Sequence, residues 1–115
     1  MHSEITDLGG QFGALAEAEK MLELAKEVIR LEDNSPEVSR MKMQMLYILG
    51  RHDIAAGHYD SGVAAIEQCM MAARRCADSD MLFSCYLQHI FHSIQTSNLE
   101  KAERYTALGL KESAE

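Results

Sequence analysis

The chain has one proline, no tryptophan and only 6% aromatic residues among its 115 positions. Because proline is the residue that most strongly breaks helices, its scarcity leaves long segments free to be helical. No segment alternates apolar and polar residues over a convincing length, so the sequence predicts no β-sheet. Abundant Ala, Leu, Met, Glu and Lys instead favour an all-α fold, and the length is that of a single domain, 1–115.

Long apolar runs and clusters of basic residues are missing as well. No run approaches the roughly 20 residues that cross a bilayer, and residues 1–4 do not have the basic, then apolar, character of a signal peptide. The net charge is −7, and Arg74-Arg75 is the one adjacent basic pair. We therefore expect a cytoplasmic protein with neither a membrane nor a nucleic-acid partner.

Cysteine is scarce and occurs in no metal-binding or redox motif. The three cysteines, Cys69, Cys76 and Cys85, fall within helical patterns and are predicted to be buried reduced thiols. The pairs Cys85/His89 and His89/His92 have the helical spacing that can chelate a metal, but nothing elsewhere in the chain supplies the further ligands that would complete a site. We expect no enzyme activity, no catalytic residues, no metal and no cofactor. A small metal- or thiol-dependent enzyme built on these three residues is the alternative.

Apolar residues recur at helical spacing in five segments that are separated by short polar turns. Ser35-Pro36, Gly57, Asp78 and the capping-box pair Ser97 and Glu100 mark helix ends. Asp60 or Ser61 would cap the third helix. The predicted helices are 11–31, 36–56, 61–76, 80–96 and 99–111, and their short connections imply that neighbours run antiparallel.

A pattern of small and bulky residues occurs three times. Its copies begin at Gly13, Gly57 and Ser97, so they are 44 and 40 residues apart. Spacings of this size indicate a repeat architecture, in which each helix pair buries its apolar face against the next. The copies are Gly13, Leu15, Ala18, Leu22, Ala25 and Lys26; Gly57, Tyr59, Gly62, Ile66, Cys69 and Met70; and Ser97, Leu99, Ala102, Thr106, Gly109 and Leu110.

The central copy, preceded by Leu49-Gly50, resembles the tetratricopeptide repeat, and the long units are similar to those in bacterial regulators. This resemblance implies about two and a half stacked helix–turn–helix units that form a segment of a right-handed superhelix. It also implies a partner-binding groove lined by the first helix of each unit. The groove residues would be Gln44, Tyr47, Arg51 and Ile54, together with Ser84, Leu87, Gln88, Phe91 and Gln95.

The function that follows from this resemblance is binding of a protein or peptide without catalysis, as the sensory or scaffolding part of a regulator in signalling. A secretion chaperone that holds one export substrate is the alternative from the same resemblance. Incomplete terminal units would leave apolar faces open, so we also expect a possible homodimer through the terminal helices.

Overall fold

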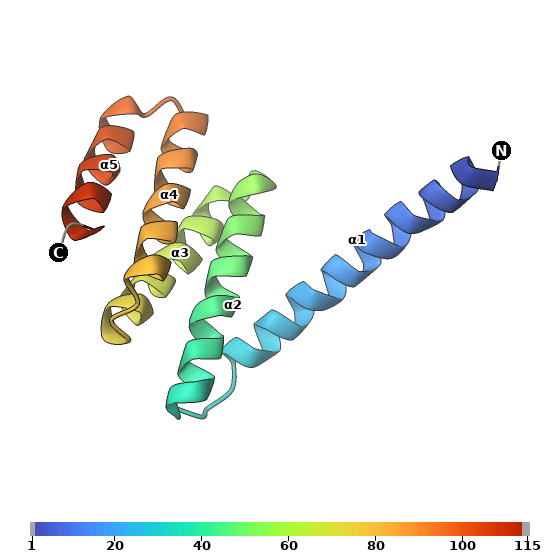
Figure 1. The fold of residues 1–115 in the computed structure, drawn as a ribbon, viewed down its shortest axis with the longest axis horizontal. Helices are drawn as coiled ribbons and strands as arrows, with labels where there is room; N and C mark the ends of the chain where they lie inside the picture. The colour runs from blue at the N-terminus through green and yellow to red at the C-terminus, as the bar shows by residue number, and fades with distance from the viewer. Residues whose placement is uncertain (1, 114–115) are drawn as a thin grey trace.

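The computed structural model describes the backbone of residues 2–113 and the side chains of residues 16–112, and in this part of the chain α-helices joined by short turns are the only regular secondary structure. The five helices are α1 (His2–Ile29), α2 (Pro36–Ala55), α3 (Tyr59–Arg75), α4 (Ser79–Gln95) and α5 (Leu99–Ser113). Each helix packs against the next one in the chain, and α2 also contacts α4 (Figure 1). The predicted all-α fold with five helices is confirmed.

The prediction for the first helix is wrong at its start, because α1 begins at His2 and continues through Gly9 and Gly10. Glycine lowers helix stability but removes no backbone hydrogen bond, so a glycine pair does not have to end a helix. Among the described helices α1 contacts α2 alone, and it extends away from the other four (Figure 1). The side chains of Gly13 and Leu15, which open the first repeat copy, lie outside the described residues.

Three helices end in the same turn. Gly57, Ala77 and Ser97 each have positive φ, at 86°, 53° and 58° respectively. At each turn this residue donates its N–H to the carbonyl three residues earlier, and the following N–H reaches the carbonyl five residues earlier. These are the two bonds of the Schellman motif, which satisfies the free carbonyls of a helix end. The motif recurs every 20 residues, so the two-helix unit has the 40-residue length seen in the sequence.

The capping residues at the helix N-termini match the sequence prediction for two of the four helices that follow α1. Ser35 and Asp78 accept hydrogen bonds from the N–H groups of residues 38 and 81, at 3.4 and 3.0 Å, as predicted. The predicted capping box is wrong, because Ser97 occupies the left-handed turn position and Asn98 Oδ1 caps α5 instead. The third helix begins at Tyr59 and not at residue 61, so Asp60 and Ser61 lie inside it.

Helices α2 and α3 cross at two glycines. A Cβ atom on Gly50 would lie 2.7 Å from the Ile66 side chain, and one on Gly62 would lie 2.9 Å from the backbone nitrogen of Ile54. Such distances are shorter than van der Waals contact, so the two backbones approach closely only because both residues lack a side chain. This confirms the predicted role of small residues where helices of a unit meet.

Helices α3 and α4 supply most of the core, and the buried residues of α4 include Cys85, Tyr86 and His89. A polar network on Tyr86 joins three helices. Arg74 of α3 donates to the Tyr86 hydroxyl at 3.0 Å, and that hydroxyl donates to Glu112 Oε1 of α5 at 2.6 Å. The pKa of Tyr86 is raised, mainly by burial and to a smaller extent by the hydrogen bond to Glu112. The hydroxyl therefore stays protonated and keeps donating to the carboxylate.

Two of the three cysteines are buried as predicted. Cys69 and Cys85 have no exposed surface, and the Cys69 thiol donates to the Met43 carbonyl. Cys76 is exposed, contrary to the prediction, because it forms the C-terminal cap of α3, where the chain turns at the surface. None of the described helices combines the length and the apolar composition that a membrane span requires.

Candidate binding surface

Most of the residues predicted for the groove lie at the surface of α2 and α4, which run side by side in the same direction (Figure 1). Gln44 and Arg51 of α2 are exposed, and Tyr47 is half-buried. On α4, Leu87, Phe91 and Gln95 are exposed, and Ser84 and Gln88 are half-buried. The structure therefore places eight of the nine predicted residues where a partner has access to them.

Ile54 is the exception and corrects the predicted set. Its side chain is fully buried and belongs to the core cluster, where it packs over Gly62. The close crossing of α2 and α3 covers this position, so Ile54 cannot contact a partner. Ile54 follows Arg51 by three residues, so helical spacing predicts that both lie on the same side of α2. Its burial becomes visible only in the crossing of α2 with α3.

The two helices make direct polar contact between the predicted positions. The side-chain amide of Gln88 donates to the Tyr47 hydroxyl at 3.5 Å, a long hydrogen bond that joins the middle of α4 to the middle of α2. Residues on either side of this contact form one surface. We name it the α2–α4 face, and its members are Arg40, Gln44, Tyr47, Ile48, Arg51, Ser84, Leu87, Gln88, Phe91 and Gln95.

Arg40 and Ile48 are members that the sequence analysis missed. Both are exposed, and each lies four residues from Gln44, on the same side of α2. The signal was therefore present in the helical spacing. Extending the predicted stripe by one turn toward the N-terminus would have found Arg40, and including the residue four positions after Gln44 would have found Ile48.

Helix α4 exposes large apolar side chains where solvated positions usually carry charge. Phe83, Leu87, Phe91 and Ile94 are 43%, 48%, 49% and 58% exposed. Scattered exposed apolar residues are ordinary, but a contiguous apolar strip on one helix is typical of an interaction site. Part of this helix therefore remains uncovered by α3 and α5.

The alternative site at Cys85, His89 and His92 is largely buried, in contrast to the exposed α2–α4 face. His89 is fully buried, stacks on Tyr105 with ring centroids 4.3 Å apart, and has Nε2 2.8 Å from Glu67 Oε1. Among the described residues neither ring nitrogen has a hydrogen-bond partner, and Nε2 is close enough to Glu67 to form an ion pair when the ring is protonated. Burial lowers the pKa of His89, and the nearby Glu67 carboxylate opposes that shift only in part.

The thiol of Cys85 is poorly suited to nucleophilic chemistry. Its hydrogen bond with Cys69, together with burial, raises its pKa, and a cysteine nucleophile needs the opposite shift. In the part of the chain that the structure describes, no three His, Cys, Asp or Glu residues are grouped closely enough to hold a metal ion. His92 instead packs edge-on against the ring of Tyr59, with centroids 4.9 Å apart.

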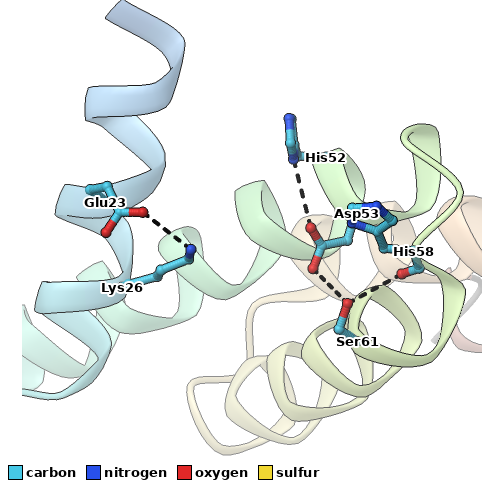
Figure 2. A network of polar contacts seen from close by, with 6 residues as sticks. All are labelled: Glu23, Lys26, His52, Asp53, His58 and Ser61. Carbon is cyan, nitrogen blue, oxygen red and sulfur yellow. Dashed lines mark hydrogen bonds and ion pairs between the residues drawn. The ribbon is translucent and has the colours of Figure 1, made fainter. Parts of the chain in front are cut away.

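A polar cluster fixes the turn between α2 and α3, at the end of the α2–α4 face. The Asp53 carboxylate lies between His52 Nδ1, at 3.7 Å, and the Ser61 hydroxyl, which donates to it at 2.9 Å (Figure 2). The same hydroxyl also lies 3.3 Å from the carbonyl of His58. Figure 2 shows a separate ion pair between Glu23 and Lys26 on α1. Asp53 is thus engaged within the fold and does not face a partner on the α2–α4 face.

The outer side of α4 and α5 has a second apolar area, where a shallow hollow of about 460 Å³ is lined by Ile90, Ile94, Leu99 and their neighbours. The predicted homodimer through the terminal helices would use this area, and it stays a prediction. A smaller hollow of about 290 Å³ lies between the start of α4 and the end of α5. The Tyr86–Glu112 hydrogen bond occupies its wall.

No known protein family, curated protein or solved structure matches this chain. The tetratricopeptide resemblance therefore rests on the residues quoted above and stays a prediction.

Proposed function

We propose that this protein binds a segment of another protein on the α2–α4 face and carries out no catalysis there. The observation that supports this most directly is the strip of exposed apolar residues on α4, next to the polar groups of α2. Leu87 and Phe91 are one helical turn apart, so together they offer a continuous apolar contact of the kind that anchors protein interfaces.

The polar residues around this strip suit an interface that forms and dissociates. Gln44, Gln88 and Gln95 supply amide groups that both donate and accept hydrogen bonds, and Tyr47 adds a hydroxyl on an aromatic ring. An apolar centre bordered by such groups is the usual composition of a protein-recognition surface. The role of sensory or scaffolding part of a regulator is consistent with this proposal, and so is that of a chaperone for one export substrate.

The experiment is selection from a random 16-residue peptide library displayed on phage, with the immobilised protein as target. We expect enriched peptides to lose about tenfold or more in affinity for the double variant Leu87→Ser/Phe91→Ser, because burial of two large apolar side chains is removed. Both positions are half-exposed, so the substitutions leave the core intact.

Met71→Ser is the matched control, since Met71 is 51% exposed on α3, away from the α2–α4 face. Enriched peptides should bind this variant as they bind the unmodified protein. Peptides that bind the double variant undiminished, or that lose equal affinity for the control, would contradict the proposed function. The same conclusion would follow if the double variant enriched the same peptides as the unmodified protein.

A further inference from the structure

The α2–α4 face differs in charge from the rest of the molecule. The chain has 18 acidic residues, yet residues 38–52 of α2 and 81–95 of α4 include no Asp or Glu. An even spread of the acidic residues would place several of them in these two segments. The acidic residues of the two helices, Glu37, Asp53 and Asp80, lie outside these segments near the helix ends, so the middle of each helix differs from an otherwise acidic protein with a net charge of −7.

Basic groups on this face have no internal partner. Arg40 and Arg51 are both exposed, and within the described residues neither forms an ion pair with a carboxylate of the chain. Arg74 shows the contrast, because its guanidinium lies 3.9 Å from Glu112 and donates to Tyr86. Among the described residues neither guanidinium group forms an ion pair, and no member of the face is Asp or Glu, although Glu37 lies one turn before Arg40. The two arginines therefore create a local positive potential in a protein whose overall charge is negative.

From this charge pattern we infer that the partner segment is an acidic amphipathic helix. Its apolar side chains pack on Leu87, Phe91 and Ile48, and its carboxylates reach Arg40 and Arg51. The two arginines are 11 residues apart on α2, which is about 16 Å along the helix axis. A helix that carries carboxylates three turns apart on one side matches this separation, and it can lie along the two parallel helices α2 and α4 by side-chain interdigitation.

This inference rests on the proposed function and adds the chemical class of the partner. Charge complementarity selects the acidic segment over a second copy docked by apolar contact alone, which would leave both guanidinium groups unpaired. The net charge of the whole molecule makes the opposite prediction, since a protein of charge −7 attracts basic peptides without specificity. The sign of the charge on the selected peptides therefore tests the inference directly.

The test uses the same peptide library and reads the charge of the enriched sequences. We expect an excess of Asp and Glu, with apolar residues three and four positions apart. We also expect affinity at low ionic strength to fall roughly tenfold for Arg40→Glu/Arg51→Glu, and this loss to shrink in high salt. Arg75→Glu/Arg104→Glu is the control, because it changes the net charge equally at two exposed positions on α3 and α5.

The outcomes separate the two proposals. Peptides that require Leu87 and Phe91 but are basic or uncharged would overturn the acidic partner and leave the binding face intact. An equal loss of affinity in both arginine pairs would also overturn it, because the effect would then come from net charge. Enriched acidic peptides with proline at their centre would overturn the helical form of the segment. Peptides indifferent to Leu87 and Phe91 would overturn the proposed function itself.

Discussion

The two helix pairs α2–α3 and α4–α5 have the same turn between their helices, yet they pack differently. In the first pair, Gly50 and Gly62 bring the helix backbones into close approach. Forty residues later the equivalent positions are Ile90 and Ala102, which have side chains. Gly109 of the second pair leaves ordinary space, since a Cβ atom there would be 3.7 Å from Tyr86.

This difference separates the part of the molecule that holds the fold together from the part that stays accessible. The α2–α3 pair is tightly crossed, and its Ile54 is fully buried. The equivalent Ile94 of the second pair is 58% exposed. The same repeat frame therefore gives a buried position where two glycines let the helices of a pair approach closely, and an exposed apolar position in the pair that lacks these glycines. The predictions below test how far the two pairs differ.

The largest expected effect comes from Gly62→Ala. A methyl group there would meet the backbone of Ile54, so the two helices must move apart, and we expect a loss of roughly 1–3 kcal/mol in the free energy of unfolding. Gly109→Ala is the matched control in the second pair, where the methyl group fits and helix propensity improves. It should gain up to about 1 kcal/mol. Urea unfolding measures both, and equal losses would contradict the proposed difference between the pairs.

The second effect is a pH dependence that originates in the α4–α5 pair. The pKa of His89 is lowered in the folded protein, chiefly by burial, so the folded state binds fewer protons than the unfolded state below about pH 6.5. Stability should be complete above that pH and fall as the pH decreases through the lowered value. Glu67 and Lys101 face His89 from α3 and α5, and His92 lies beside it on α4.

The variant His89→Phe keeps a flat ring against Tyr105 and removes the titrating group. Its unfolding free energy should change less between pH 7.5 and 5.5 than that of the unmodified protein. His58→Gln, at an exposed position, is the control and should keep the full pH dependence. If the unfolding free energy of His89→Phe fell as much as that of the unmodified protein over this range, a group other than His89 would cause the pH dependence.

The smallest effect concerns the shared turn. Ala77 and Ser97 adopt positive φ without being glycine, which costs an L-residue about 1–2 kcal/mol. Part of this is offset by the flexibility of glycine in the unfolded chain, so Ala77→Gly and Ser97→Gly should each stabilise by about 0.5–1 kcal/mol. Gly57→Ala should have the opposite sign. Thermal unfolding of the three variants is sufficient, and an unchanged melting temperature for all three would show that the turn carries no strain.

Much of the fold was accessible from the sequence because the signals were local. Pro36 after Ser35, Gly57 and Asp78 are residues whose chemistry fixes a helix end, and the structure confirms each. Ala77 gave no such signal, since alanine favours the helix interior. The start of α1 was missed because glycine pairs indicate a turn only on average.

The candidate surface was predictable to the extent that helical spacing decides which residues share a side. Spacing placed Gln44, Arg51, Leu87 and Phe91 at the surface, as observed. It failed for Ile54 because burial there depends on the close crossing with α3, which the spacing of residues within α2 does not show. It could not show that Arg40 and Arg51 lack internal ion pairs, which depends on the positions of every carboxylate in three dimensions.

The turns at Gly57, Ala77 and Ser97 have one further consequence. The backbone has the same positive φ and the same hydrogen bonds at each turn. A segment that runs from just after the turn residue Gly57 to the turn residue Ser97 therefore begins and ends in matching backbone conformations. Residues 58–97 can thus be inserted in tandem, and the added helices would inherit the stacking direction of the originals. The architecture is in this sense extendable, and the number of inserted units sets how much exposed helix surface the molecule displays.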